Sequence, residues 1–238
     1  MGDWVEIWSY LAETPLIWLS ATLAAYIIGD WCATRAGRAP LVNPVLVAVV
    51  LLAAVLWLTG TSYADYFEGA QFVHFLLGPA TVALAVPLWL HRATVRRALL
   101  PVLAALVAGS GVAVFSVLWI AQAYGLPSDL LATLAPKSTT APVALGISES
   151  LGGSPTLTAV LVILTGMIGA IVVTPLMNAL RIRDWRARGF AVGVAAHGIG
   201  TARAFQVNPQ AGAFAGIGMA LNAMLTALLA PWALGLFL

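Results

Sequence analysis

Long runs of apolar residues dominate the chain, and most are about as long as a helix that crosses a bilayer. A spanning helix needs about 20 mainly apolar residues. The runs cover residues 15–29, 41–59, 72–90, 99–124, 157–180 and 211–238. This pattern predicts an all-α fold, a polytopic transmembrane helix bundle that occupies residues 1–238 as a single integral membrane domain.

Two further segments, residues 130–153 and 189–206, are less apolar and are interrupted by polar and helix-breaking residues. In the first, prolines and glycines recur too often for one continuous helix. Non-helical backbone at membrane depth must be buried in protein or line a wet cavity, because lipid cannot satisfy its N–H and C=O groups. We therefore expect discontinuous or re-entrant helices inside the bundle.

The arginines give an orientation. They follow the first, third and fifth runs, as Arg35, Arg38, Arg92, Arg96, Arg97, Arg181, Arg183, Arg186 and Arg188. Basic residues stay in the cytoplasm, which puts the N-terminus and Asp129 outside. A single crossing by residues 130–153 would then put the last arginine cluster outside as well. Either this segment enters and returns on one side, or it crosses twice as two short halves, or the rule fails in this chain.

Composition strengthens the membrane assignment. Only 8% of the 238 residues are charged and 61% are hydrophobic, with a formal net charge of +2 and a mean hydropathy of +0.97. So few charges exclude a soluble enzyme, a disordered chain and a nucleic-acid binder. The single cysteine, Cys32, excludes an internal disulfide and a cysteine-based metal site. We expect no cofactor and no metal.

Residues 135–142 hold the only lysine of the chain and three hydroxyl groups. The polar residues are Lys137, Ser138, Thr139 and Thr140, and Pro142 follows them. A lysine at membrane depth faces a cavity or a partner, because its insertion costs about 2.5–3.5 kcal/mol. We expect these residues and the free N–H groups of a helix break to bind an anionic substrate, with Glu149 pairing with Lys137 across a hairpin. The alternative is a lysine that snorkels to an interface.

Residues 196–204 form a second polar segment. Gly198 and Gly200 loosen a helix beside His197, Thr201 and Arg203. An arginine matches a carboxylate with two hydrogen bonds, and a histidine can donate one or carry a proton. We therefore expect the three polar residues to bind the same substrate. In the alternative reading, the arginine reaches the opposite interface and the histidine is a satisfied interior residue.

The two polar segments are weakly similar, since each has a hydroxyl followed by alanine soon after a cationic or titratable residue. Transporters often carry paired broken elements that meet near the midplane, so an inverted repeat is possible. Gly78 and Pro79 predict a kinked helix whose Thr81 lines the same cavity, although a plain packing kink fits equally well. Asn222 either bonds across helices or takes part in ordinary helix packing. Ser138 beside Lys137 is no hydrolase dyad, because adjacent helical residues do not face each other.

Four stretches resemble the LrgB/CidB family of bacterial membrane proteins. They are residues 77–88 (LGPATVALAVPL), 136–142 (PKSTTAP), 152–153 (GG) and 188–203, which begins RG and ends HGIGTAR. The chain departs from the family at Ala196, where a serine is usual, and at Gln206, near which relatives commonly carry an acid. If that acid couples ions in relatives, the coupling is in doubt here.

The resemblance implies two functions. Plant relatives are plastid glycolate/glycerate translocators and bacterial ones are linked to pyruvate movement, which implies a transporter of small 2-oxo or 2-hydroxy monocarboxylates. The holin-like or antiholin-like description implies a pore or a regulator of murein hydrolase activity and lysis. Either way, the resemblance implies a multi-pass protein of the bacterial inner membrane, an oligomer, and a small LrgA-like membrane partner. A pore predicts polar stripes along whole helices, whereas this chain concentrates polarity in two short segments, which favours a discrete site.

Overall fold

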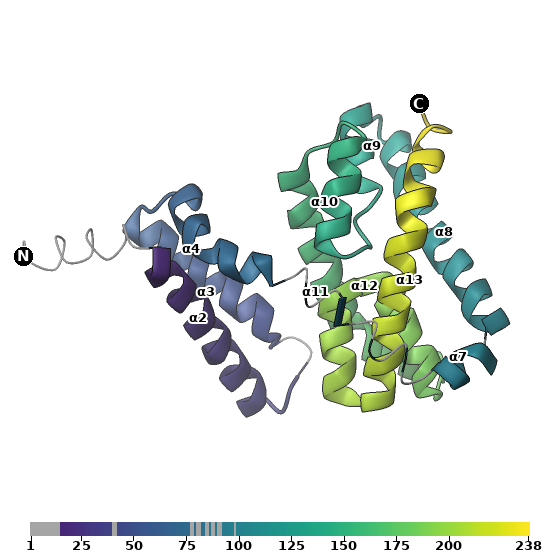
Figure 1. The fold of residues 1–238 in the computed structure, drawn as a ribbon, viewed down its shortest axis with the longest axis horizontal. Coiled ribbons are helices and arrows are strands. Elements are labelled where there is room, and N and C mark those ends of the chain that lie inside the picture. Colours follow the sequence, from purple (N-terminus) through teal and green to yellow (C-terminus); the bar gives the residue numbers. More distant parts are fainter. Residues whose placement is uncertain are drawn as a thin grey trace, which may run out of the picture. The chain divides into compact units, whose positions relative to one another are not determined.

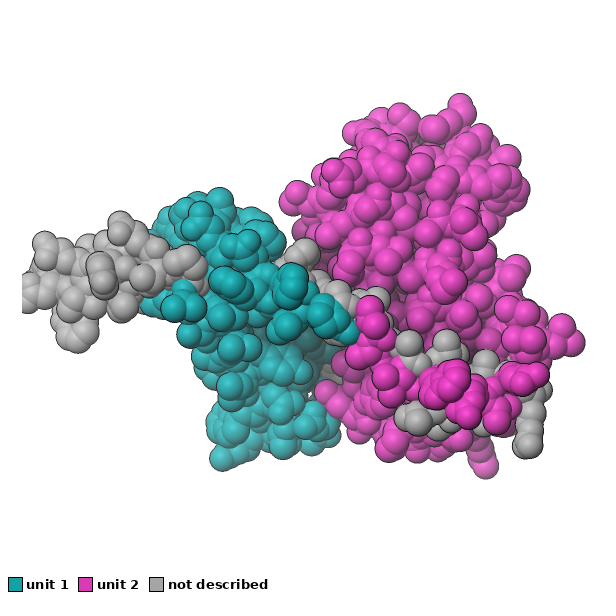
Figure 2. Space-filling view, in the orientation of Figure 1, with its two compact units in different colours: residues 1–80 teal, residues 81–238 magenta. Residues whose placement is uncertain are grey.

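The computed structural model describes residues 15–39, 42–76, 92–97 and 99–238, together with positions 79, 82, 83, 86 and 89. Every regular element within these residues is a helix, which confirms the all-α prediction. The chain divides into two compact units, residues 1–80 and 81–238, coloured separately in Figure 2. The single domain expected from the sequence stays a prediction, and each unit is described by itself.

The described residues of the first unit form three helices: α2 (Pro15–Arg35), α3 (Pro44–Thr59) and α4 (Tyr63–Phe75). Helix α3 begins where it does because the Asn43 side chain accepts the N–H of Val45 at 2.8 Å, and it ends at Gly60, whose left-handed backbone closes the last turn. Helix α4 packs on α2 through an edge-to-face contact between the rings of Tyr66 and Trp18.

Seven helices are described in the second unit. They are α7 (Arg92–Arg97), α8 (Leu99–Ala123), α9 (Ser128–Leu134), α10 (Ala141–Ser150), α11 (Pro155–Ala179), α12 (Trp185–Val207) and α13 (Pro209–Leu234). Figure 1 shows α8 and α13 as long rods, with α9 and α10 gathered near one end of them. Among the described residues, α8, α11, α13 and α2 are long and apolar enough to cross a membrane, whereas α3 is shorter.

Helices α9 and α10, with the turn at residues 135–140 between them, form a re-entrant hairpin that we call hairpin 1. The chain comes back to α9 after α10, because the N–H of Ser154, just after α10, donates to the Thr133 hydroxyl near the end of α9 at 2.8 Å. The tip of hairpin 1 lies beside the middle of α13, since the Ser138 carbonyl accepts a hydrogen bond at 3.0 Å from Asn222, halfway along that helix. Hairpin 1 therefore enters the unit and returns at the same end.

Helix α12 is a second hairpin, hairpin 2. Its backbone is non-helical at Ala196 and His197, and the two arms lie side by side. A Cβ atom on Gly200 would come within 3.0 Å of the Val192 carbonyl oxygen, eight residues back, which is impossible in a continuous helix. Trp185 and Val207, the first and last residues of α12, line the same cavity.

The two hairpins enter from opposite ends. The open end of hairpin 1 packs with the last turns of α8 and α13, through residues such as Leu118, Ile147 and Ala233. The arms of hairpin 2 pack with the first turns of α8 and α13, through Phe190 and Phe214 among others. Each hairpin follows a helix of 25 residues, α8 or α11, and those two helices run in opposite directions. Such an order of elements is what an inverted repeat would give, and the repeat itself stays a prediction.

The return of hairpin 1 confirms the re-entrant interpretation of residues 130–153 and excludes both a single crossing and a double crossing. The starts of α8 and of α12 lie at one end of the unit, which we call the arginine end after Arg181, Arg183, Arg186 and Arg188.

In the connection to α12, hydrogen bonds from Arg186 hold the pKa of the Asp184 carboxyl below its usual range. The same carboxylate caps α12 by accepting the N–H of Arg186 at 2.8 Å.

Glycines let hairpin 2 lie directly on α13. An added Cβ atom would stand only 2.0 Å from the Ala211 carbonyl oxygen at Gly189, and 2.0 Å from that of Ala215 at Gly193. Small residues four apart allow two helix backbones to approach closely, and membrane helices associate through such packing. The Gly189–Gly193 spacing therefore fixes where the first arm of hairpin 2 sits.

We expect Gly193→Ala to destabilise the protein by about 1–3 kcal/mol, because its methyl group must displace the α13 backbone. Gly111→Ala is the matched control: it has the same helix propensity gain in α8, and a Cβ there meets nothing within 4 Å. Thermal unfolding in detergent should show a lower midpoint for the first variant only. Equal midpoints would contradict the close packing of α12 on α13.

Cysteine accessibility tests the two hairpins. In a Cys32→Ser background, Ser128→Cys and Ser150→Cys should react with a membrane-impermeant thiol reagent from one side, and Arg183→Cys and Gln210→Cys from the other. All four positions are exposed at the ends of hairpins 1 and 2. Reaction of the first two cysteines from opposite sides would mean that residues 128–150 cross the membrane, against the structure.

Candidate functional site

The tip of hairpin 1 holds the predicted lysine and hydroxyls. Lys137 donates from Nζ to Ser138 Oγ at 3.1 Å, and both Ser138 and Thr139 are buried. Within the described residues no acidic side chain pairs with this ammonium group. A buried cation without a counter-charge is costly, and a bound anion reduces that cost.

The start of α10 adds positive character to this tip. Thr140 is the N-cap residue, but its side chain makes no capping hydrogen bond, and Pro142 in the first turn has no N–H. The first N–H groups of a helix have no partner within the helix and carry a partial positive charge. A helix start beside Lys137 therefore favours a negatively charged ligand.

The tip of hairpin 2 carries His197 in an unusual backbone conformation, with φ of 41° and ψ of −133°. Residues other than glycine rarely adopt such backbone angles, so contacts with neighbouring residues hold His197 in this conformation. Its ring nitrogen Nε2 lies 2.9 Å from the Val162 carbonyl oxygen of α11, to which it donates. Gly166 makes room for the ring, since a Cβ there would stand 2.7 Å from His197 Cε1.

His197 is thus buried and its ring has a hydrogen-bond partner, as expected from the alternative in which it is an interior residue without a ligand. The Thr201 hydroxyl donates back to the His197 carbonyl at 2.8 Å, and Gly198 and Gly200 follow the break. These residues shape the second tip, whereas the binding of substrate by His197 and Thr201 stays a prediction.

Asn222 ties both tips to the long helices. Its Nδ2 donates to the Ser138 carbonyl at 3.0 Å and to the Val194 carbonyl at 3.1 Å. Its Oδ1 accepts from the hydroxyls of Ser110, at 2.6 Å, and Thr226, at 3.3 Å. The backbone breaks free these two carbonyls, and one buried amide satisfies both. Of the two readings of Asn222, bonding across helices is therefore correct.

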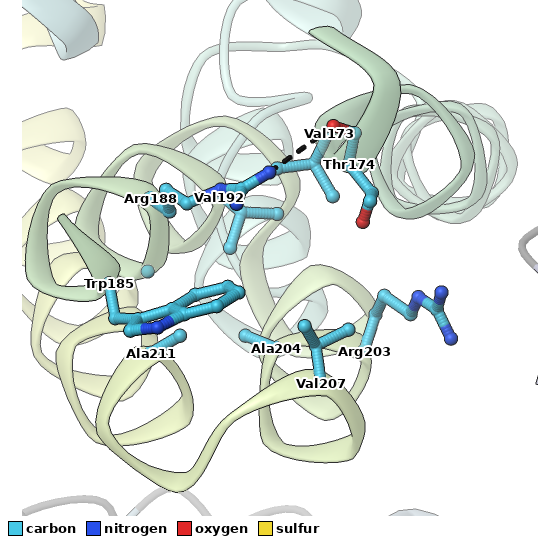
Figure 3. A pocket seen from close by; sticks show the side chains of 10 residues that line it. Val173, Thr174, Trp185, Arg188, Val192, Arg203, Ala204, Val207 and Ala211 are labelled. Atoms are coloured by element: carbon cyan, nitrogen blue, oxygen red, sulfur yellow. Dashed lines mark hydrogen bonds between the residues drawn. The ribbon is translucent and has the colours of Figure 1, made fainter. Parts of the chain in front are cut away.

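Arg203 lies apart from this centre. It stands on the returning arm of hairpin 2 and lines a cavity of about 30 Å³ at the arginine end, together with Trp185, Arg188 and Thr174. Figure 3 shows its guanidinium directed away from Trp185, and neither Lys137 nor His197 lines the cavity. Since a water needs about 10–15 Å³, the cavity holds a few waters and no organic acid. The structure does not bring Arg203 and Lys137 into one pocket.

Arg188 shares that cavity and is held firmly. Its guanidinium stacks on the Trp185 ring at 4.8 Å and donates to the Thr174 carbonyl at 3.3 Å (Figure 3) and to Asn178. Arg203 lies 3.5 Å from the Gln206 side chain. The two arginines therefore belong to the mouth of hairpin 2.

One predicted pair is wrong. Glu149 does not meet Lys137, because it is exposed at the far end of α10 while the lysine lies at the tip of the hairpin.

Gly78 and Thr81 lie outside the described residues. Pro79 is described as an isolated helical position, so the predicted kink stays a prediction.

Sequence reasoning missed a second set of buried hydroxyls at the open end of hairpin 1. The Thr158 hydroxyl of α11 lies 2.8 Å from Ser148 Oγ and 3.0 Å from the Thr133 carbonyl. It also missed Ser110, the partner of Asn222. Ser110 and Thr158 lie in apolar stretches, and the one signal was the position of Ser110 between Gly109 and Gly111.

These features define a multi-pass membrane protein of the α-helical class, with two half-length hairpins that meet inside the bundle. The sequence model of the LrgB-like family matches residues 22–236. The chain belongs to this family.

Curated relatives agree. The chain is 36% identical over 198 residues to the uncharacterized protein YxaC of Bacillus subtilis, and 35% identical over 201 residues to the holin-like protein CidB of Staphylococcus epidermidis. It is 34% identical over 198 residues to the CidB of Staphylococcus aureus. Each alignment covers 83% of this chain and 86% of the relative. No solved structure matches the chain.

Proposed function

We propose that the protein moves small 2-oxo or 2-hydroxy monocarboxylates, of the pyruvate, glycolate or glycerate class, across the bacterial inner membrane by alternating access. The observation that supports this most is the meeting of two half-length hairpins from opposite ends at Asn222. Secondary transporters bind substrates near the midplane at such paired broken helices, with half-helix N-termini directed at anionic groups.

The charge of the site favours a monocarboxylate. Lys137 is the one cation at the two tips, and Arg203 lines a separate cavity. One ammonium group balances one carboxylate. We place Lys137 and the hydroxyls of Ser138, Thr139 and Thr140 as the binding groups, with His197 and Thr201 shaping the opposite wall.

A holin-like function is the second candidate, and the names of the Staphylococcus relatives favour it. Under this reading the protein assembles with a partner into a pore or controls lysis. The hairpin tips would then be structural, and solute would pass without saturation. An LrgA-like partner and an oligomeric state belong to both proposals.

Uptake by proteoliposomes separates the two. Labelled pyruvate, glycolate and glycerate should enter with saturable kinetics when the purified protein is present, with or without an LrgA-like partner protein. Competition by unlabelled acid at millimolar concentration is expected under the transporter reading. Flux that rises linearly with concentration, or leakage of unrelated solutes of similar size, would favour the holin-like reading instead.

A further inference from the structure

The Thr139 hydroxyl is an anomaly in the tip of hairpin 1. Its side chain is fully buried, with a relative exposure of 0%, and no described residue forms a hydrogen bond with its Oγ1. Most buried polar atoms in proteins have a partner, so each exception calls for an explanation. An orphan hydroxyl in a dry site lowers stability unless something else binds it.

Among the polar side chains of this tip, the Thr139 hydroxyl is the fully buried one without a hydrogen-bond partner, whereas Thr140 is only half-buried. Ser138 accepts from Lys137 with its hydroxyl and from Asn222 with its carbonyl. The backbone N–H of Thr139 itself donates to the Pro136 carbonyl at 3.0 Å. Thr140 caps α10 with its backbone. Thr139 lies two positions after Lys137 in the chain, so their Cα atoms are at most about 7 Å apart.

We propose that Thr139 determines specificity at the carboxylate site, its hydroxyl binding the oxygen on C2 of the substrate while Lys137 binds the carboxylate. This inference rests on the proposed transport function and adds the reason for its substrate class. A 2-oxo group accepts a hydrogen bond from Oγ1, and a 2-hydroxy group can accept or donate one. An acid that lacks this oxygen leaves Thr139 without a partner.

The expected discrimination follows from that difference. An unmet buried hydroxyl weakens binding by roughly 10- to 100-fold, and a site built to hydrogen-bond a polar group strongly rejects the analogue without it. Glycolate and acetate differ only in the C2 oxygen, as do lactate and propionate. The ratio of their inhibition constants reports recognition of that oxygen, and the change of this ratio in a Thr139 variant measures the contribution of Thr139.

The test is competition against labelled glycolate uptake in proteoliposomes. Wild-type protein should bind glycolate roughly 10- to 100-fold more tightly than acetate. Thr139→Val, which keeps the shape and removes the hydroxyl, should reduce this ratio to about 3 or less, and Thr139→Ser should restore it. Ser150→Ala, at the exposed far end of α10, is the control and should leave the ratio unchanged.

Thermal unfolding provides a second readout that needs no transport. Without ligand, Thr139→Val should be at least as stable as wild type, since it removes an unsatisfied polar atom. Glycolate should raise the wild-type midpoint more than acetate does, and should lose this advantage in the variant. An unchanged ratio in Thr139→Val, or an equal loss for both acids, would overturn the role of Thr139. Absence of saturable uptake in wild type would instead overturn the transport function.

Discussion

Lys137→Met is expected to abolish saturable carboxylate uptake while the protein still reaches the membrane. The substitution keeps a long flexible side chain and removes the only ammonium group of the chain. Loss of one partner from a buried charge pair costs about 2–5 kcal/mol, which corresponds to a loss of at least about 30-fold in uptake efficiency. The measurement is kcat/KM for labelled pyruvate or glycolate in proteoliposomes.

Arg183→Ala is the matched control for this experiment. It also removes one positive charge, but from an exposed position in the connection between α11 and α12. Its uptake should stay within about twofold of wild type. If Lys137→Met transports as well as this control, the ammonium group has no part in binding, and the snorkelling alternative becomes the better account.

The largest effect on stability is expected for Asn222→Leu. The change removes four hydrogen bonds and leaves the Ser138 and Val194 carbonyls buried without a donor. Each such group costs about 1–3 kcal/mol, so we expect a loss of about 2–5 kcal/mol, or roughly 5–15 °C in the unfolding midpoint. Because the amide joins both hairpins, uptake should also fall.

Gln210→Leu replaces an exposed amide on the same helix and should leave the midpoint nearly unchanged. Thr226→Val removes one weak hydrogen bond of 3.3 Å, so its unfolding midpoint should lie between those of Asn222→Leu and Gln210→Leu. A midpoint for Asn222→Leu equal to that of Gln210→Leu would show that the amide does not hold the hairpin tips.

Sequence alone predicted the main feature of the second unit, the return of residues 130–153 to their own side. The reason is physical: the arginine clusters indicate which connections share one side of the membrane, and Pro136 and Pro142 forbid one continuous helix. The structure places the turn between α9 and α10 at these residues. Only a short similarity between the two polar segments suggested an inverted repeat. In the structure the similar elements are longer, since each consists of a long helix followed by a hairpin.

Sequence could not predict the direction of the chain after His197. Two glycines and a histidine indicate a loose helix, but a kink and a full reversal leave the same pattern. The reversal places Arg203 beside Trp185 at the arginine end and away from Lys137, which is why the two cations do not share the predicted pocket. The role of Asn222 was also undetermined, because three of its four partners, Ser110, Ser138 and Val194, come from distant segments.

Substrate protection of a cysteine at the tip of hairpin 1 tests the central claim most directly. Thr140 is half-buried and its side chain makes no cap, so Thr140→Cys in a Cys32→Ser background should fold normally. The claim predicts that glycolate slows modification of this cysteine by a small thiol reagent, with a concentration dependence that matches uptake. A modification rate that stays the same at every glycolate concentration would contradict a carboxylate site between the two hairpins.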